Sequence, residues 1–254
     1  MTMDAAALHL RGAQSVVVFT GAGASAESGI PTFRDALTGL WERFDPAQLA
    51  TPDAYRADPS LCWGWYEWRR RKVALAQPNA AHHAIAELAR RVPKLTVVTQ
   101  NVDDLHERGG SLQVIHLHGS LNSPRCIDCG LPHTLALPLD TLPEGGVRLE
   151  PPRCSGCNGC IRPGVVWFGE MLPEQAWSEA LEAVEDCDFF LSVGTSGIVY
   201  PAAELPLRAL GNGATVVHVN PVLFDVSSQE HFLKGPASQM VPTLLRCAFP
   251  GVGQ

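Results

Sequence analysis

The clearest pattern along the chain is the alternation of short apolar runs with longer amphipathic stretches. Runs with the length and apolar character of buried strands occupy residues 15–20, 95–101, 113–119, 164–170, 189–196 and 214–220. Stretches with apolar residues at helical spacing occupy residues 79–92, 174–187 and 201–213. This alternation predicts an α/β fold in which helices cover both faces of a parallel sheet. Ligands of such sheets bind at the carboxyl ends of the strands.

Two stretches interrupt the alternation. Residues 36–77 are rich in tryptophan and mostly helical in pattern, whereas residues 123–161 contain many Gly and Pro residues. We expect these two insertions to form a smaller domain together. The larger domain would then consist of residues 1–35, 78–122 and 162–254.

The composition is that of an ordinary folded, soluble chain. Of 254 residues, 46% are hydrophobic and 18% charged, which argues against disorder. The formal charge of -7 gives no reason to expect a nucleic-acid partner. No apolar stretch has the length of a bilayer span, and the N-terminal residues lack a secretory signal pattern. We therefore expect a cytoplasmic protein without a membrane partner, and a monomer by default.

The cysteines are clustered, and their spacing indicates a metal site. Five of the eight lie between residues 126 and 160. Two Cys-x-x-Cys pairs, Cys126 with Cys129 and Cys154 with Cys157, flank residues 130–153, a separation typical of a four-cysteine zinc site. Four thiolates leave no open coordination position, so the zinc would be structural. Cys160 forms a further Cys-x-x-Cys pair with Cys157 and stays an alternative ligand.

A glycine-rich turn follows the first predicted strand. The sequence "GAGASA" at residues 21–26 fits the pattern G-x-G-x-x-A, in which glycines let the backbone approach a pyrophosphate at a helix N-terminus. A purely structural turn is an equal alternative on this evidence alone. The segment that follows, "SGIPTFRDALTGLW", is not the second strand of an ordinary dinucleotide-binding unit.

Further motifs follow the glycine turn in a definite order. They are "GAGASAESGIPTFRDALTGLW" (21–41), "TQNVDDLHERGG" (99–110), "HGS" (118–120), "RPGVVWFGE" (162–170), "GTS" (194–196) and "KGPAS" (234–238). Together they resemble the signature of the sirtuins, the NAD-dependent protein-lysine deacylases, from about residue 12 to about residue 245. The resemblance implies a Rossmann-like NAD-binding domain, with a smaller lobe made of a helical insertion and a zinc ribbon.

The resemblance also implies NAD as co-substrate, structural zinc with Cys157 as last ligand, and acyl-lysine proteins or peptides as partners. The residues that it assigns to NAD are Gly21, Ala22, Gly23, Glu27, Ile30, Phe33, Arg34, Trp41, Gln100, Asn101, Val102, Asp103, Gly194, Thr195, Ser196, Asn220 and Ala237. Of these, Ala22 and Ile30 would line the nicotinamide pocket.

Four of these residues have more specific implied roles. Asn101 would hold the ribose side and a water, and Asp103 would accept a hydrogen bond from the carboxamide of nicotinamide. Phe33 would cover the cavity that nicotinamide leaves, and Arg34 would lie near the ribose and phosphates. The structural alternatives are an Asx turn after a strand for Asn101 and Asp103, and core packing for Phe33.

A histidine is expected to act as the base. In the implied reaction the acyl oxygen attacks the nicotinamide ribose, nicotinamide leaves, and a histidine activates a ribose hydroxyl; an imidazole has the near-neutral pKa that this step needs. His118 matches the family residue. His116 is the competitor, on the same strand face if the strand continues to His118.

The strand predicted at residues 164–170 is expected to pair with the substrate backbone. The implied substrate-binding residues there are Val166, Phe168, Gly169 and Glu170. Three departures from the family put details of the groove in doubt. Gly164 replaces a larger residue, Gly197 replaces a frequent serine, and "NPV" (220–222) lacks a frequent acid.

The stretch "WYEWRRRK" (65–72) suggests an acyl preference. Tyr66 and Arg69 share a helix face and match the pair that marks sirtuins acting on negatively charged acyl groups. A succinyl or malonyl carboxylate would give Arg69 a charge-assisted partner, so we expect desuccinylation and demalonylation to exceed deacetylation. For Arg70, Arg71 and Lys72 we favour a solvated helix surface.

The alternatives to this function come from three classes. They are a deacetylase without a preference for acidic acyl groups, a protein mono-ADP-ribosyltransferase, and a non-catalytic module that binds NAD or ADP-ribose. The presence of His118 with Asn101 and Asp103 favours a catalytic protein over a pure binding module.

Overall fold

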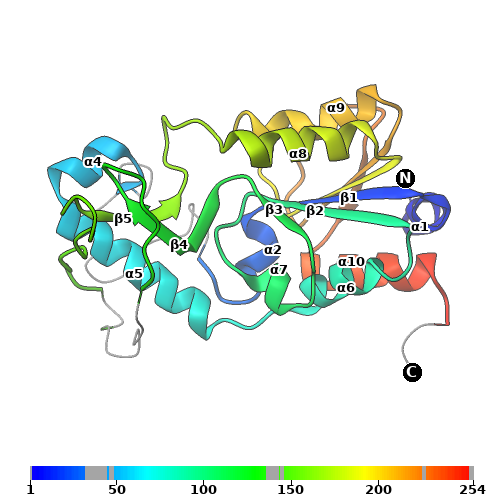
Figure 1. The fold of residues 1–254 in the computed structure, drawn as a ribbon. Coiled ribbons are helices and arrows are strands. Elements are labelled where there is room, and N and C mark those ends of the chain that lie inside the picture. Colours follow the sequence, from blue (N-terminus) through cyan, green and yellow to red (C-terminus); the bar gives the residue numbers. More distant parts are fainter. Residues whose placement is uncertain are drawn as a thin grey trace. The chain divides into compact units, whose positions relative to one another are not determined.

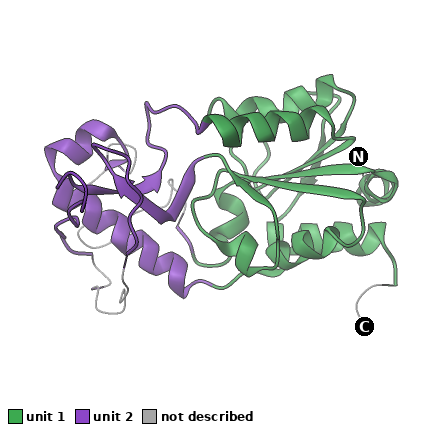
Figure 2. Cartoon of the chain, in the orientation of Figure 1, with its two compact units in different colours: residues 1–29, 77–117, 174–254 green, residues 30–76, 118–173 purple. Residues whose placement is uncertain are grey.

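The computed structural model describes residues 2–31, 45, 49–135, 143, 146–224 and 227–251. The chain forms two compact units (Figure 2). Unit 1 consists of Met1–Gly29, Gln77–Leu117 and Glu174–Gln254, and unit 2 of Ile30–Ala76 and His118–Pro173. Unit 2 thus begins at Ile30 and also contains residues 118–122 and 162–173, all of which the sequence pattern assigned to the larger domain.

Unit 1 is built on a six-stranded sheet whose neighbouring strands are all parallel. Its strands are β1 (Ser15–Thr20), β2 (Lys94–Thr99), β3 (Val114–His116), β6 (Phe189–Val193), β7 (Thr215–Asn220) and β8 (His231–Lys234). The order β3-β2-β1-β6-β7-β8 reverses direction between β1 and β6. The parallel sheet with this strand order confirms the predicted α/β fold. The switch point is the usual place where a Rossmann-like sheet binds its ligand.

Helices cover both faces of this sheet (Figure 1). The helices of unit 1 are α1 (Met3–Gly12), α2 (Ala22–Ala26), α6 (Ala80–Leu88), α7 (Leu105–Arg108), α8 (Glu174–Glu185), the 3-10 turn η3 (Ala202–Glu204), α9 (Leu205–Gly211) and α10 (Ala237–Ala248). On one face, α8 and α9 lie side by side, and α1, α6 and α10 pack together on the other. The central strands β1, β6 and β7 are buried from both sides, which explains why they read as continuous apolar runs.

In the described residues of unit 2, two helices accompany a short antiparallel pair of strands. They are α4 (Pro52–Ala57), α5 (Pro59–Leu75), β4 (Gly119–Cys126) and β5 (Ile161–Val165). Asp58 caps α5 by accepting a hydrogen bond from the Leu61 amide at 3.1 Å. An aromatic cluster forms the core: Tyr55 and Tyr66 both contact Trp167, with ring centroids 5.2 and 6.3 Å apart, and all three are buried.

The strand predicted at residues 164–170 is wrong in position and in sheet. β5 ends at Val165 and pairs antiparallel with β4, not with the parallel sheet. The physical reason is a local turn. The Glu170 carboxylate accepts a hydrogen bond from the Trp167 amide at 2.8 Å and binds Arg162, which bends residues 166–170 away from a strand.

The solvated surface expected for Arg70 is also wrong. Arg70 is 8% exposed, and its guanidinium donates hydrogen bonds of 3.1 and 2.6 Å to the two carboxylate oxygens of Glu67, which is equally buried. A guanidinium can be buried when a carboxylate neutralises it. None of the helices in the part of the chain that the structure describes has the length and apolarity to cross a membrane.

Candidate functional site

The glycine loop lies at the switch point of the unit 1 sheet. After β1, the Gly21 amide donates to the Val193 carbonyl at 3.0 Å, and the Gly23 amide donates to the Gly194 carbonyl at 2.9 Å. A Cβ atom on Gly23 would lie 2.7 Å from the Gly194 Cα, and a Cβ atom on Gly21 would lie 3.0 Å from the Thr195 Cα. The ends of β1 and β6 therefore approach more closely than side chains allow.

The adjoining predicted residues belong to the same edge of the sheet. The Asn220 side chain donates to the Thr195 carbonyl at 2.8 Å, and the Thr195 hydroxyl lies 2.9 Å from that of Ser192. The Gln100 amide donates to the Thr20 carbonyl at 2.9 Å. Val102 and Ser196 are half-buried, and Ala22 is exposed at the start of α2.

Glu27 connects the end of the glycine loop to α10. Its carboxylate accepts hydrogen bonds from the amide and hydroxyl of Ser238, at 3.0 and 2.6 Å. Ser238 lies in the first turn of α10, directly after the predicted NAD residue Ala237, which is 3% exposed. A carboxylate is favourable at a helix N-terminus. Through this contact Glu27 fixes the N-terminus of α10 next to the glycine loop.

Asn101 and Asp103 are buried after β2 and meet at one serine. The Asn101 side-chain amide donates to the Ser25 hydroxyl at 3.1 Å, and Ser25 in turn hydrogen-bonds the Asp103 carboxyl. Burial raises the pKa of Asp103, against the hydrogen bonds from Leu105 and Ser25 that lower it. Asp103 also accepts from the Leu105 amide at 3.1 Å, so it forms the Asx turn as well.

Two buried histidines, His82 and His106, lie next to Ser25 and Thr20. His82 Nδ1 accepts from the Asn79 amide at 3.2 Å, so its Nε2 carries the proton and faces the Ser25 hydroxyl at 3.5 Å. His106 Nε2 lies 2.8 Å from the Thr20 hydroxyl, which donates to Thr99 at 2.8 Å. Burial lowers the pKa of His82 to about 4 and that of His106 to about 3, so both rings are neutral near pH 7.

The two candidate bases differ in their surroundings. His116 ends β3, where its ring contacts the Asn101 carbonyl at 3.2 Å and the Glu107 carboxylate at 2.7 Å. Burial lowers the pKa of His116, but the hydrogen bond and charge of Glu107 outweigh it, so the pKa is raised. His118 lies beyond the strand, in the turn before β4, and its carbonyl accepts from the Val166 amide at 2.8 Å. The strand therefore does not continue to His118.

Three predicted NAD residues, Phe33, Arg34 and Trp41, lie outside the described residues. Among the predicted substrate residues, Phe168 is 48% exposed and its amide donates to the Ala50 carbonyl at 2.9 Å. Gly169 lies in the turn that follows, and Glu170 uses its carboxylate within the turn described above.

Arg69 follows Tyr66 by about one turn of α5. The buried Tyr66 hydroxyl accepts from the Trp167 indole at 2.9 Å, and among the described residues its own proton remains available for donation. Burial raises the pKa of the Tyr66 phenol, although the Arg69 charge lowers it. Arg69 lies over the Trp65 ring, 5.1 Å from the centroid. It also lines a small hollow in unit 2, of which Ile30 forms part.

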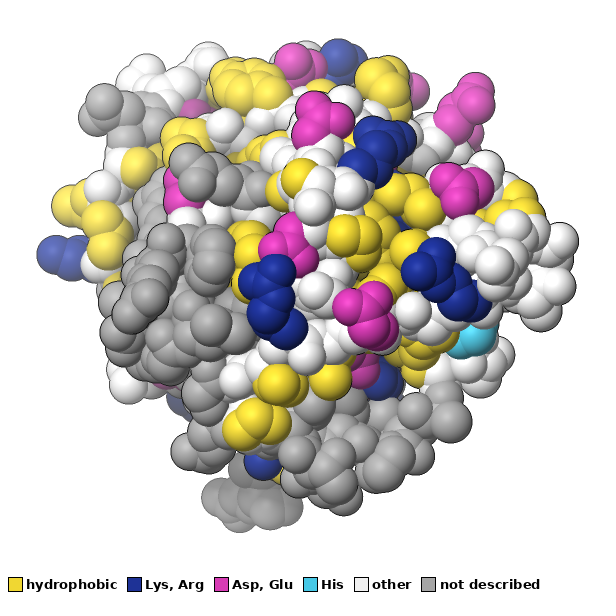
Figure 3. Space-filling view, turned by 90° about the vertical axis from the view of Figure 1, so that its left-hand side faces the viewer, with side chains coloured by type: hydrophobic (Ala, Val, Ile, Leu, Met, Phe, Trp, Pro, Cys, Tyr) yellow, Lys and Arg dark blue, Asp and Glu magenta, His cyan; other side chains and the backbone are white. Residues whose placement is uncertain are grey.

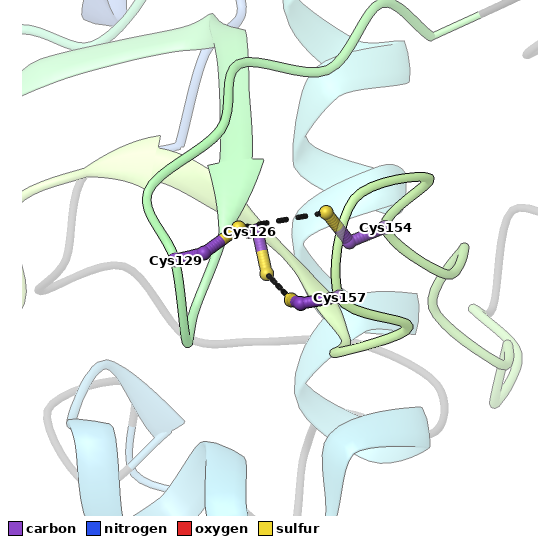
Figure 4. Close-up of side chains that lie close together, drawn as sticks. All are labelled: Cys126, Cys129, Cys154 and Cys157. Carbon is purple, nitrogen blue, oxygen red and sulfur yellow. Dashed lines mark hydrogen bonds between the residues drawn. The ribbon is translucent and has the colours of Figure 1, made fainter.

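The four predicted metal ligands are brought together (Figure 4). The sulfur atoms of Cys126, Cys129, Cys154 and Cys157 all lie within 4.8 Å of one another. Cys126 and Cys157 are 3.4 Å apart and Cys129 and Cys154 are 3.6 Å apart, close to the separation of about 3.8 Å for thiolates on tetrahedral zinc. Hydrogen bonds from the backbone of Cys129 and Asp128 lower the pKa of the Cys126 thiol to about 7, whereas hydrogen bonds among the four thiols raise the pKa of Cys129 and that of Cys157. The site therefore fits zinc.

Cys160 does not belong to this cluster among the residues described. Its carbonyl accepts a hydrogen bond from the Ile127 amide at 3.0 Å, and the thiol is half-buried. The alternative set of ligands that Cys157-x-x-Cys160 suggested is therefore not the one that the fold assembles.

Comparisons with known proteins agree with this geometry. A model of the Sir2 family matches residues 21–201. NAD-dependent protein deacylase 1 of Pseudomonas aeruginosa is 61% identical over 243 residues, which cover 95% of this chain and 97% of the relative. The chain belongs to the Sir2 family. NAD-dependent protein deacylase of Methylococcus capsulatus is 56% identical over 238 residues, 93% of each chain. A solved Sir2 homolog–NAD complex is 43% identical with a TM-score of 0.87, and the match covers 98% of this chain and 94% of that one.

Two departures from the Sir2 sequence pattern have local explanations. A Cβ atom on Gly164 would lie 1.9 Å from the Ser123 carbonyl oxygen, because β4 shifts register between Ser120 and Arg125. Gly197 has φ +70°, a conformation that side chains such as serine rarely adopt. Neither departure touches the glycine loop of this Sir2 protein.

Sequence reasoning missed three residues of the site: Ser25, His82 and His106. Ser25 lies within the quoted motif, but its partner Asn101 is 76 positions away. His82 carried a local signal, since it lies three residues after the helix-capping Asn79. His106 lies in the motif "TQNVDDLHERGG", and its burial against Thr20 follows only from the packing of α7 on the sheet.

Proposed function

We propose that the protein is an NAD-dependent protein-lysine deacylase that prefers succinyl- and malonyl-lysine to acetyl-lysine. Membership of the Sir2 family and the names of its relatives support the deacylase reaction. The single observation that carries the acyl preference is the arrangement of Tyr66 and Arg69. Both lie on α5, with the phenol in contact with Trp167 and the guanidinium at a hollow.

Unit 1 carries the groups suited to NAD. NAD, when bound, supplies the ribose carbon that accepts the acyl oxygen, releases nicotinamide, and leaves ADP-ribose to receive the acyl group. Gly21 and Gly23 let the loop after β1 pack against Gly194 at the switch point, which is the usual place of ligand phosphates in a Rossmann-like sheet. Asn101 and Asp103 present a carboxamide and a carboxyl group that Ser25 holds in place, and these groups suit hydrogen bonds to ribose and to nicotinamide.

His118 is the base that we assign in unit 2. A neutral imidazole takes a proton near pH 7, as the activation of a ribose hydroxyl requires. His116 is a weaker candidate because both of its ring nitrogens are engaged within unit 1, one with the Asn101 carbonyl and one with Glu107. His118→Tyr is therefore expected to abolish turnover with the fold intact.

The acyl preference follows from the chemistry of the carboxylate. An acetyl group offers neither the Tyr66 hydroxyl nor the Arg69 guanidinium a charged partner, whereas a succinyl or malonyl carboxylate offers one to both. Hydrogen bonds to charged groups contribute about 1.5–3 kcal/mol, which corresponds to roughly ten- to a hundredfold in preference.

The experiment is a panel of peptides that differ only in the acyl group on lysine, assayed with NAD. We expect kcat/KM for succinyl- and malonyl-lysine to exceed that for acetyl-lysine by about tenfold or more. Arg69→Met should remove most of this difference and leave deacetylation unchanged or faster. Arg90→Met, which removes a cation from the surface of unit 1, is the control and should behave as the wild type.

Two results would contradict the proposal. A wild-type preference for acetyl-lysine, or an equal loss of kcat/KM for every acyl group in Arg69→Met, would contradict the proposed acyl preference. Neither result would contradict the proposed deacylase activity. Release of nicotinamide at the same rate with unmodified peptide would instead indicate protein ADP-ribosylation.

A further inference from the structure

His116 ends β3 beside the residues that follow β2. In this parallel pair Thr99 stands opposite His116, and the Leu117 amide donates to the Thr99 carbonyl at 2.9 Å. The carboxyl ends of neighbouring parallel strands meet at one edge of the sheet. The imidazole therefore lies against the loop that carries Asn101 and Asp103, and only 19% of its side chain is exposed.

Both ring nitrogens of His116 face groups that can only accept a hydrogen bond. Nδ1 lies 3.2 Å from the Asn101 backbone carbonyl, and Nε2 lies 2.7 Å from a carboxylate oxygen of Glu107. Burial raises the pKa of Glu107, but the hydrogen bond from His116 outweighs it, so the carboxylate is ionised near pH 7. A neutral imidazole has one N–H for these two acceptors, whereas an imidazolium donates to both. This arrangement therefore requires a positively charged His116.

His218 has the opposite arrangement and provides a comparison within the same unit. Its Nε2 lies 2.9 Å from a Glu230 carboxylate oxygen, but its buried Nδ1 has no hydrogen-bond partner among the described residues. A neutral ring satisfies this arrangement, and burial lowers the pKa of His218 more than Glu230 raises it. Burial also lowers the pKa of His116, but Glu107 and the Asn101 carbonyl outweigh it. The two histidines thus differ by a second acceptor, which His116 has and His218 lacks.

The charged groups around the His116 imidazole come from three elements. Glu107 and His106, which is neutral near pH 7, belong to α7, and Asp103 belongs to the loop after β2. Arg108 of α7 forms an ion pair of 3.5 Å. The helix α8 also packs on β3, and its ionisable residues are Glu174, Glu179, Glu182 and Glu185. These surroundings are net acidic, which favours the charged form of the ring.

The position of this charge makes it different from the charges on the surface. Figure 3 shows one face of the molecule, on which basic and acidic side chains are interspersed. Water and salt screen such exposed charges strongly. The His116 ring is mostly buried and acts on Asp103, which is 5% exposed. Burial raises the pKa of Asp103, and the charge of His116 acts against this effect.

We propose that His116, as an imidazolium held by Glu107, is a positioning residue for the nicotinamide end of NAD, because it fixes the Asn101 backbone carbonyl and keeps a positive charge near Asp103. This inference rests on the proposed function, in which Asn101 and Asp103 suit hydrogen bonds to ribose and nicotinamide. The carboxylate holds the Nε2 proton more strongly than the carbonyl holds the Nδ1 proton. Deprotonation of His116 therefore releases the Asn101 carbonyl and removes the charge together.

The proposal has a defined pH dependence. His116 keeps its proton below its raised pKa and loses it as the pH rises through that value. The loop after β2 is therefore held fully at the lower pH, and KM for NAD should rise on the alkaline side. An imidazolium has no free lone pair on its ring nitrogens, so in this state His116 cannot be the base that activates a ribose hydroxyl.

The first measurement needs neither NAD nor an acyl-lysine peptide. Nitrogen-15 NMR of the free protein distinguishes an imidazolium from both neutral tautomers, and the signals of His116 are those that disappear in His116→Gln. We expect an imidazolium at pH 7. Glu107→Gln keeps an acceptor for Nε2 and removes the charge, so in this variant His116 should titrate at a lower pH than in the wild type.

The second measurement is KM for NAD from about pH 6 to about pH 9, with the acyl-lysine peptide that the wild type turns over fastest. We expect the alkaline rise in KM to be about tenfold. In Glu107→Gln the rise should begin at a lower pH, displaced by the same interval as the NMR titration. His116→Gln cannot titrate and should have a raised KM at every pH, with kcat changed less. His9→Gln removes an exposed histidine of α1 and should follow the wild type.

The outcomes separate this inference from the function on which it rests. A neutral His116 at pH 7 in the free protein overturns the inference and leaves the proposed function standing. A shifted NMR titration in Glu107→Gln without a matching shift in KM for NAD overturns the positioning role. An increase in KM that is equal at every pH also overturns it, because a merely structural contact acts in this way. If the wild type consumes no NAD with any acyl-lysine peptide, the proposed function fails and the positioning role with it, whatever the NMR spectrum shows.

Discussion

At the scale of single residues, the close contact between Gly23 and Gly194 has the most direct consequence. The Gly23 amide binds the Gly194 carbonyl, and a Cβ atom on Gly23 would lie 2.7 Å from one backbone atom of Gly194 and 2.9 Å from another. Both neighbours belong to the backbone and cannot rotate away as a side chain could. A methyl group would therefore move one of the two loops.

We predict that Gly23→Ala raises the KM for NAD by at least tenfold, because a displacement of about 1 Å at a binding loop is enough for losses of this size. Steady-state kinetics with varied NAD would measure it, and circular dichroism would verify the fold. Gly12→Ala is the matched control, since a Cβ atom there meets nothing within 4 Å. An unchanged KM for NAD in Gly23→Ala would contradict the prediction, because it would mean that the loop accommodates the methyl group without moving.

At the scale of elements, the sequence could predict those parts whose cause is local. The apolar run at residues 15–20 coincides with β1, and the spacing of the cysteines identified all four members of the cluster. The sequence did not reveal α10, which contains Pro242, a residue that usually disfavours a helix interior. The turn after β5 depends on the pairing of Arg162 with Glu170, which no periodicity displays.

The same limit applies to the candidate site. Motifs identify Asn101 and Asp103, but the serine that joins them is known only from packing. The pattern of charges around residue 70 looks like a solvated helix face, yet Arg70 is buried with Glu67. Whether a cation faces solvent, a carboxylate or a hollow is decided by neighbours from other elements, so helical spacing alone could not assign the three arginines and Lys72.

The cysteine cluster gives a prediction for unit 2. We expect one zinc per chain, lost in Cys126→Ala and retained in Cys160→Ala, because only the first removes a member of the cluster. Metal analysis would measure the stoichiometry. Chelation should unfold unit 2 and change the fluorescence of its buried tryptophans, Trp63, Trp65, Trp68 and Trp167. Retained zinc and activity in Cys126→Ala would contradict the assignment.

At the scale of the whole molecule, the buried histidines link stability to pH. The pKa of His82 is lowered to about 4 and that of His106 to about 3, from ordinary values of 6.5. Below pH 6.5 the unfolded chain therefore binds protons that the folded chain refuses. The contribution of these two neutral histidines to the free energy of unfolding is complete above pH 6.5 and is lost as the pH falls toward 4. His116 has a raised pKa and acts in the opposite direction over part of this range.

A comparison of variants isolates one histidine from these opposing effects. His106→Gln keeps an N–H donor for the Thr20 hydroxyl but cannot take a proton. We predict that its free energy of unfolding falls less between pH 7 and pH 5 than that of the wild type, by about 2 kcal/mol. Urea denaturation at both pH values would measure this. Parallel losses in the two proteins would mean that His106 does not govern the acid response.

The close approach of β4 and β5 limits how this protein can exchange parts with its relatives. A Cβ atom on Gly119 would lie 2.1 Å from the Gly164 carbonyl oxygen, and one on Gly164 would lie 1.9 Å from that of Ser123. A substitution in either strand therefore affects the packing of the other, although the two strands lie far apart in the sequence. A chimera that imports β5 with a larger residue at position 164 must import β4 as well, and drift at either strand is constrained by the other.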